Sequence, residues 1–218
     1  MDSNFIKELK EIIDERHLLK HPFYQMWTKG TLPKEVMRKY AEQYIHLEAN
    51  FPIFLSLMHT VCGDKYDIRQ EIVENLHDEE YGEENHRELW LRFAEAIDAK
   101  REDVESCDPI PETQNSVDAF KQLSSEHFLS GAGALAAYES QMPEVSASKI
   151  KGLKDNYDIT SDRGLKFFVV HGILDVEHAD SWWEIIEKYA DTNELKDRVR
   201  EAVTQGRDAL WGFLDGIV

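Results

Sequence analysis

Histidines and carboxylates recur at helical spacing in one apolar segment of this chain. His171, Asp175 and His178 fall within about 60° of one another on a helical wheel, because an α-helix turns about 100° per residue. They interrupt the apolar stretch FFVVHGILDVEHADSWW, which indicates a buried helix. Buried imidazole and carboxylate groups must be paired or must bind a metal. The stripe therefore predicts a metal site more readily than an ion-pair site.

Two further segments supply the other candidate ligands. Glu79 and His86 are seven residues apart, and on a continuous helix this spacing places them two turns apart on the same side. Glu139 follows a stretch of small residues, where a carboxylate needs a partner from a closely packed helix. We predict that these three histidines and three carboxylates share one buried site. Helical salt bridges or surface pairs explain each motif separately, and the residues alone leave that alternative open.

The ligand types indicate which metals such a site would take. Mixed imidazole and carboxylate ligands suit non-haem iron or manganese, and the lack of thiolates among them argues against a structural zinc site. Three carboxylates nearly balance the charge of two divalent ions. Six ligands shared by two ions leave open positions for dioxygen and a substrate. We therefore predict two divalent metal ions with dioxygen as co-substrate.

The elements that position these residues are predicted to be helices almost throughout, because no segment alternates between apolar and polar residues as a strand does. An amphipathic stripe also marks the N-terminal residues 5–13. The further helices are expected at 34–61, with a bend near Pro52, and at 67–98, 116–129, 132–141, 143–157, 162–189 and 193–213. Short connections and the lack of a linker predict one all-α domain over residues 1–218.

Composition excludes several classes of function. The chain has 218 residues and a formal net charge of −18, which argues against binding to nucleic acid or to an anionic membrane surface. No apolar run is long enough for a transmembrane helix, and the acidic N-terminus does not resemble a signal peptide. Only two cysteines are present, so no disulfide framework is expected. These features predict a cytoplasmic protein.

Four segments carry a resemblance to a known family: HPFYQMWTKGTLPKE, NLHDEEYGEENHRELW, AYESQMPEVSASKIKGL and HGILDVEHAD. They are similar to the Chlamydia protein associating with death domains and its bacterial relatives, which form the CADD-like group of the haem-oxygenase-like superfamily. Pyrroloquinoline-quinone synthase C and TenA belong to the same superfamily. The resemblance covers residues 5–190 and implies a haem-oxygenase-like bundle of about seven helices, with a central dinuclear site of two irons, or of manganese and iron. Its ligand positions fall on the six residues predicted above: Glu79, His86, Glu139, His171, Asp175 and His178.

The resemblance also implies a reaction, the synthesis of p-aminobenzoate for folate biosynthesis from one of the protein's own tyrosines. The matching tyrosine is Tyr24, and the matching lysine that gives the amino nitrogen is Lys149. A second family tyrosine matches Tyr40. A third, near the metals, is replaced by Phe167 here, which removes one hydroxyl from the implied oxidation route. An external reductant is needed in addition to dioxygen.

Two other functions stay open from the sequence. The same di-metal site would also serve an external small substrate, by fatty-acid decarboxylation, N-oxygenation or C–C cleavage. A protein with a merely structural metal site, acting as an interaction protein, is the third hypothesis. The amphipathic C-terminal helix, with Trp211 and Phe213 expected on its surface, would serve a homodimer, and the alternative is a helix that closes the bundle.

Overall fold

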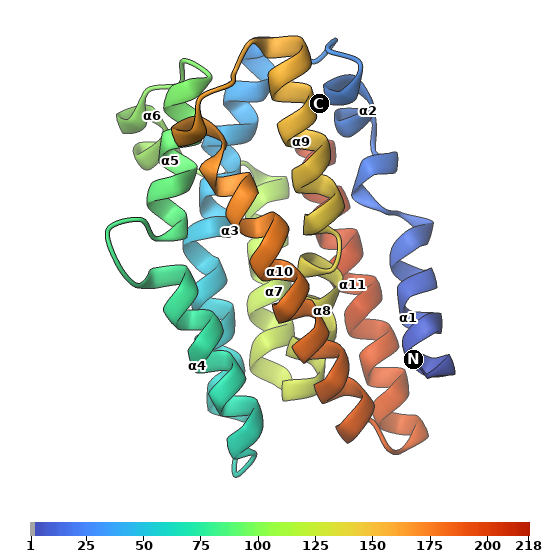
Figure 1. The fold of residues 1–218 in the computed structure, drawn as a ribbon. Helices are drawn as coiled ribbons and strands as arrows, with labels where there is room; N and C mark the ends of the chain where they lie inside the picture. The colour runs from blue at the N-terminus through green and yellow to red at the C-terminus, as the bar shows by residue number, and fades with distance from the viewer. Residues whose placement is uncertain (1–2) are drawn as a thin grey trace.

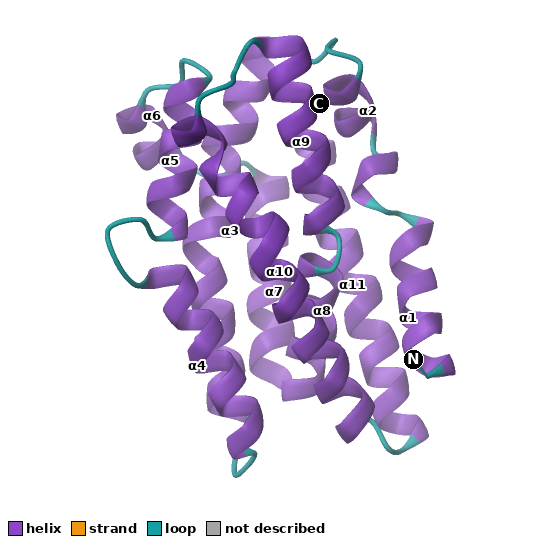
Figure 2. Cartoon of the chain, in the orientation of Figure 1, coloured by secondary structure: helices purple, strands orange, loops and turns teal. Residues whose placement is uncertain are grey.

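Helices make up most of the chain, and no strand is present among residues 3–218, the part that the computed structural model describes (Figures 1 and 2). Their bounds are α1 (Asn4–Glu15), α2 (Pro22–Thr28), α3 (Lys34–Val61), α4 (Tyr66–Glu80), α5 (His86–Ala96), α6 (Arg101–Ser106), α7 (Pro111–Glu126), α8 (Phe128–Glu139), α9 (Met142–Tyr157), α10 (Asp162–Tyr189) and α11 (Asn193–Ile217). A short 3-10 helix, Leu18–Lys20, joins α1 to α2. The all-α class is confirmed.

The predicted number of helices is too low, since the described residues form eleven α-helices where about seven were expected. Short helices such as α2 and α6 contain too few turns to show a clear period. The expected helix 67–98 is also two helices, α4 and α5, because the chain turns between them. Gly82 adopts a φ of +92° in that turn, and Asn85 caps α5 by accepting a hydrogen bond from the backbone N–H of Glu88.

Helix α8 forms the centre of the bundle. Every one of its residues is buried, as expected for a helix that is apolar on all sides. Its small residues let neighbouring helices approach closely, and a Cβ added to Gly206 of α11 would lie only 3.0 Å from the Cα of Ala134. The last residue of this buried helix is Glu139, so the fold places a carboxylate inside the core.

The two longest helices, α3 and α10, pack against the same two helices of the core. Each has 28 residues, and each packs against both α5 and α8. Pro52 lies inside α3, in the region where the sequence predicts a bend. Ser161 begins α10 by accepting a hydrogen bond from the N–H of Gly164. Together α3, α5, α8 and α10 enclose the polar residues of the candidate site.

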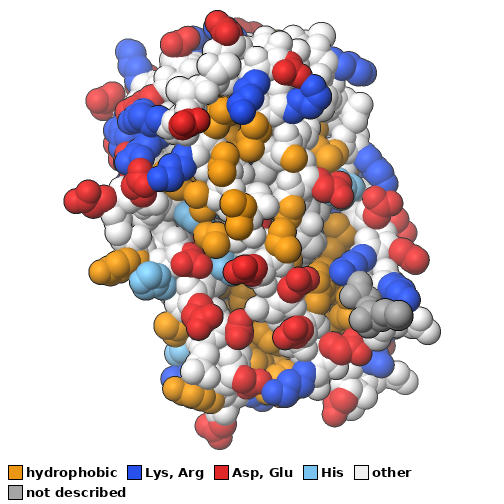
Figure 3. All heavy atoms as spheres, in the orientation of Figure 1, with side chains coloured by type: hydrophobic (Ala, Val, Ile, Leu, Met, Phe, Trp, Pro, Cys, Tyr) orange, Lys and Arg blue, Asp and Glu red, His pale blue; other side chains and the backbone are white. Residues whose placement is uncertain are grey.

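The surface over α10 combines acidic side chains with an apolar stripe (Figure 3). Val169, Ile173 and Val176 of α10 are exposed, on the side of the helix away from its buried polar residues. Phe213, expected on the surface, is instead buried in the core, and Trp211 is partly covered by His21. No helix within residues 3–218 is both long enough and apolar enough to cross a membrane.

Candidate metal centre

Two groups of three side chains meet in the interior with the arrangement that a metal ion needs. Glu48, His86 and His171 form the first group, on α3, α5 and α10. Glu139, Asp175 and His178 form the second, on α8 and α10. Within each group, one nitrogen or oxygen atom per residue lies within 4.8 Å of the others. We call these the first and the second ligand group.

Glu79 lies between the two groups. Its Oε2 is 2.9 Å from Nδ1 of His86, in the first group. Its charge also acts on the pKa values of Asp175 and His178, in the second group. Glu79 would therefore supply a further carboxylate to a metal ion held at this site.

The sequence argument for Glu79 and His86 is wrong in its geometry, although the two side chains do meet. Glu79 lies near the end of α4, and His86 is the first residue of α5. Their proximity therefore comes from the turn at Gly82 and not from two turns of one helix. The structure also brings His171, Asp175 and His178 onto the buried side of α10, as predicted.

Neighbouring side chains orient several of these groups. Glu139 accepts hydrogen bonds from Nδ2 of Asn75, at 3.1 Å, and from the indole N–H of Trp182. Nδ1 of His171 lies 2.9 Å from the backbone carbonyl of Phe167. A proton on that nitrogen leaves Nε2 with a lone pair, which is the tautomer that binds a metal.

The electrostatics of the site favour a bound cation. Burial, followed by the charges of Glu139 and Glu79, raises the pKa of Asp175 well above its usual range. Burial and then Glu79 raise the pKa of Glu48 to about 8. Burial lowers the pKa of His86, but Glu79 and then Glu48 outweigh it and raise it to about 9. Carboxylates that disfavour one another's charge in this way are stabilised by divalent ions.

Unpartnered polar atoms support the same interpretation. The buried atoms that have no hydrogen-bond partner include Glu48 Oε1 and Asp175 Oδ2. Leaving a buried polar atom unpaired costs about 1–3 kcal/mol. The residues of both groups therefore fit a pair of metal ions, in ligand type, in number and in unsatisfied atoms.

Glu48 is the one member of these groups that the sequence analysis missed. It lies in the middle of α3, beside Leu47 and one turn from Tyr44 and Phe51, all of which are buried. A charged residue on the apolar side of a long helix was the signal that could have revealed it. Glu139 was predicted from a different signal, its place after a stretch of small residues.

The chain's candidate catalytic residues gather in a second buried chamber, which we call the tyrosine–lysine chamber and define by Tyr24, Tyr40 and Lys149. Lys149 is only 2% exposed, and its Nζ donates a hydrogen bond to the hydroxyl of Tyr40 at 2.5 Å. The same Nζ lies 5.6 Å from the ring centroid of Tyr24. Burial lowers the pKa of Lys149 to about 7, against an opposing effect of Glu48.

Comparison with known proteins identifies the family. The family model described as "Iron-containing redox enzyme" matches residues 38–211, most of the chain. The chain belongs to this family. The matched residues include every member of both ligand groups.

Two of the curated relatives that the chain resembles carry the same name. A 4-aminobenzoate synthase from Nitrosomonas europaea is 43% identical, over 99% of this chain and 91% of the relative. A 4-aminobenzoate synthase from Chlamydia pneumoniae is 36% identical, over 99% of this chain and 96% of the relative. A pyrroloquinoline-quinone synthase from Acinetobacter baumannii is more distant, at 26% identity over 90% of this chain and 79% of the relative. The predicted resemblance is therefore confirmed.

Solved structures share the fold. A TenA homologue from Pseudomonas syringae superimposes with a TM-score of 0.85 at 20% identity, over 98% of this chain and 92% of that chain. A CADD-like protein from Nostoc punctiforme gives 0.81 at 16% identity, over 98% and 95% of the two chains. At these identities the match concerns the fold alone. The predicted haem-oxygenase-like architecture is confirmed.

Phe167 joins the two buried regions of this family member. Its ring stacks on His171, with centroids 4.0 Å apart, and lies 6.4 Å from the ring of Tyr44. The hydroxyl of Tyr44 hydrogen-bonds that of Tyr138 at 2.6 Å. Phe167 thus occupies the space between a candidate ligand and the tyrosines, but it offers no hydroxyl there.

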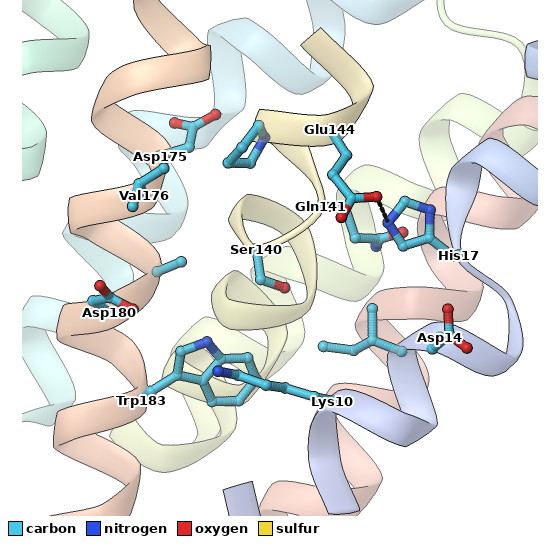
Figure 4. A pocket seen from close by; sticks show the side chains of 13 residues that line it. Lys10, Asp14, His17, Ser140, Gln141, Glu144, Asp175, Val176, Asp180 and Trp183 are labelled. Atoms are coloured by element: carbon cyan, nitrogen blue, oxygen red, sulfur yellow. Dashed lines mark ion pairs between the residues drawn. The ribbon is translucent and has the colours of Figure 1, made fainter. Parts of the chain in front are cut away.

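Two cavities approach the ligand groups from different sides. One, of about 310 Å³, lies between α1, α9 and α10, and Asp175 stands at the end opposite Asp14 and Lys10 (Figure 4). The other, of about 280 Å³, is lined by Glu48 and Glu79. Small molecules or ions thus have two approaches to the candidate metal centre.

Proposed function

We propose that this protein is a 4-aminobenzoate synthase that makes its product from its own Tyr24, with Lys149 as the source of the amino nitrogen. The observation that carries the proposal is the buried amine of Lys149, 5.6 Å from the ring centroid of Tyr24. The name shared by the relatives from Nitrosomonas europaea and Chlamydia pneumoniae supports the product. The family's description as iron-containing redox enzymes supports an oxidation.

The atoms of the product map onto these two side chains. The Tyr24 side chain supplies the ring and, through Cβ, the carboxyl carbon. Its Cα–Cβ bond breaks, Cα takes up a hydrogen and remains in the chain as glycine, and Cβ is oxidised to a carboxylate. Nζ of Lys149 forms a new bond to the ring carbon that carries the hydroxyl, and the oxygen leaves as water. The Nζ–Cε bond of the lysine then breaks, with Cε left at the oxidation level of an aldehyde. Dioxygen is the oxidant, and an external reductant supplies the remaining electrons.

Lys149 is prepared for this role by its surroundings. A lysine amine forms bonds to carbon only when it is neutral, and a pKa of about 7 leaves half of it neutral at that pH. Tyr40 accepts its hydrogen bond and fixes the position of Nζ. Tyr24 itself stays protonated, because burial raises the pKa of its hydroxyl well above the usual value.

The six predicted ligands would hold the metal ions, two irons or a manganese and an iron. When bound, such a centre activates dioxygen for oxidation chemistry. His171 is oriented for this by the carbonyl of Phe167, and Glu139 by Asn75 and Trp182. The protein's own contribution is therefore to fix the ligands and to exclude water.

The size of the tyrosine–lysine chamber favours the protein's own tyrosine over an external aromatic substrate. Tyr24, Tyr40, Tyr138 and Lys149 line a cavity of only about 10 Å³. That space accommodates about one water molecule and no aromatic ring. The only tyrosine rings that fit beside Lys149 are those already present in the chain.

Mass spectrometry after aerobic incubation with iron(II) and a reductant tests the proposal. The intact chain should lose the Tyr24 side chain, and 4-aminobenzoate should appear at no more than one molecule per chain. Protein containing ring-labelled tyrosine and ¹⁵N-lysine should pass both labels to the product. Tyr24→Phe should bind the same amount of metal and make no product. Product formed by this variant would falsify the use of Tyr24.

The cavity beside Asp175 favours a second candidate, an external small substrate oxidised at the same metal centre (Figure 4). This candidate predicts several turnovers per chain and an unchanged protein mass. The two functions are thus separated by one measurement. The homodimer and the cytoplasmic location remain predictions.

A further inference from the structure

Glu48 stands at the inner end of the 280 Å³ cavity, which lies between α3 and the connection from α4 to α5. Glu48 and Glu79 are each 5% exposed and form its buried end. Glu80 and Arg87 line it nearer the surface. The cavity therefore leads from solvent to two carboxylates of the candidate metal centre.

The carboxylate of Glu48 is incompletely satisfied. Its Oε1 is buried and has no hydrogen-bond partner. The carboxylate lies within 4.8 Å of a ring nitrogen of both His86 and His171. A buried carboxylate oxygen with two imidazole nitrogens nearby is the donor set of a metal site, whereas an apolar core would exclude it.

The six predicted ligands do not fully balance the charge of two divalent ions, and Glu48 would complete that balance. Glu79, Glu139 and Asp175 contribute three negative charges to two divalent ions, so one positive charge remains in a buried site. A fourth carboxylate makes the site neutral. Neutrality matters because an uncompensated charge inside a protein costs several kcal/mol.

The outer part of the cavity is suited to a hydrated cation. Five of the seven residues from 78 to 84 are acidic. Arg87, on the cavity wall, is paired with Glu105, and Glu84 is paired with Arg92 and Lys166. Six water molecules around an ion occupy roughly 180 Å³ at their liquid volume. The cavity is larger than that, so an ion can enter before it loses its water.

We propose that Glu48 is a fourth carboxylate ligand, binding the ion of the first ligand group, and that this cavity is the route by which divalent metal ions enter. The proposal rests on the two-metal centre of the proposed function. Glu80 attracts the ion at the outer part of the cavity, and Glu48 receives it at the inner end. Acidic residues elsewhere on the surface have no part in this route.

Titration of the metal-free protein with Co²⁺ tests the role of Glu48. Wild-type protein should bind two ions, and Glu48→Gln should bind the first-group ion at least about tenfold more weakly, as expected when a ligand is lost. The metal-free variant should melt no lower than wild type, because the carboxyl group that it replaces has an unpartnered buried oxygen. Unchanged binding of two ions by Glu48→Gln would overturn the ligand assignment.

The rate of Co²⁺ uptake, followed by absorbance, tests the route. Glu80→Gln should slow uptake about twofold at low ionic strength and leave the affinity unchanged, because it removes one attracting charge. Its matched control is Glu201→Gln, on the surface of α11. Equal uptake rates in the two variants would overturn the route. Wild-type protein that binds no metal would overturn the proposed function as well, whereas normal 4-aminobenzoate synthesis by Glu48→Gln would overturn this inference alone.

Discussion

The metal centre and the tyrosine–lysine chamber are both buried and polar, but they satisfy their polar atoms in opposite ways. In the metal centre, oxygens of Glu48 and Asp175 have no partner. In the chamber, Nζ of Lys149 donates to Tyr40 and lies over aromatic rings. The polar atoms of the metal centre are satisfied only when an ion binds, whereas Nζ of Lys149 in the chamber has its partners in the folded chain. This difference supports the proposal that the metal centre takes reactants from solvent and that the chamber supplies them from the chain.

Replacing the lysine should have the largest effect on the chamber and none on the metal centre. Lys149→Met keeps the volume and removes the nitrogen, so 4-aminobenzoate formation should fall below detection while metal content stays at the wild-type level. Mass spectrometry of the product and elemental analysis of the protein measure the two quantities. Lys151→Met is the matched control, since Lys151 is exposed on the same helix and pairs with Asp155. If Lys149→Met lost its metal, the two regions would not be independent.

Replacing a ligand should produce the reverse pattern. Asp175→Asn should reduce metal content from about two ions to about one per chain, with the tyrosine–lysine chamber intact. A ligand that binds only the folded state at 100 times its Kd raises stability by about 2.7 kcal/mol, so the variant should lose a stabilisation of this order when metal is added. Thermal melting with and without Mn²⁺ measures it. Asp180→Asn, at an exposed position of α10, should behave as wild type.

The dependence of product formation on pH should follow the titration of Lys149 in the tyrosine–lysine chamber. With its pKa at about 7, the amine of Lys149 is mostly protonated at pH 6 and mostly neutral at pH 8. Product formation should therefore rise about tenfold over this range, if metal content is held constant. The groups that face this amine are the hydroxyl of Tyr40, the rings of Tyr24 and Tyr44, and the charge of Glu48.

The free energy of unfolding should also depend on pH through the titration of Lys149. Because the folded pKa is below the unfolded value of about 10.4, the unfolded chain binds more protons between pH 7 and 10.4. Lys149 should therefore make stability rise with pH in that window, and Lys149→Met should remove this rise. Chemical denaturation at several pH values measures it, and a pH-independent difference between the two proteins would place the pKa elsewhere.

The smallest effect should come from the packing of the chamber wall. A Cβ added to Gly152 would lie 2.5 Å from the indole of Trp27, so Gly152→Ala should lower the free energy of unfolding by about 1–3 kcal/mol. Gly172→Ala, on the helix of the metal centre, meets only Ser146 at 3.8 Å and should stabilise by about 0.5–1 kcal/mol. Denaturant titration separates these outcomes, and equal stabilities would show that the wall repacks freely.

The helical period predicted the placement of the site residues correctly where all of them lie on one helix. His171, Asp175 and His178 lie on a single helix, and the structure places them as the sequence indicated. Glu79 and His86 were expected to meet on one helix but lie on two. A turn with a positive φ at Gly82 interrupts the helix there, and the seven-residue spacing gave no sign of it.

Residues that function through long-range packing were harder to predict. The burial of Lys149 depends on α2, α3 and α10 meeting α9, and nothing in its own segment distinguishes it from Lys151. Only the family resemblance drew attention to it. Glu48 was missed because it belongs to no motif, and its unpartnered oxygen becomes visible only when α3 is packed against α5 and α10.

In the proposed reaction, the buried position of Tyr24 would also set the lifetime of the molecule. Its ring packs against Phe23 in the core, and losing a large buried side chain costs about 3–5 kcal/mol. The glycine left in α2 would cost a further 0.5–1 kcal/mol or so. Domains are stable by only about 5–15 kcal/mol, so a spent chain would unfold far more often than a fresh one. Proteases would then remove used molecules selectively, and supply of the product would be limited by new protein synthesis.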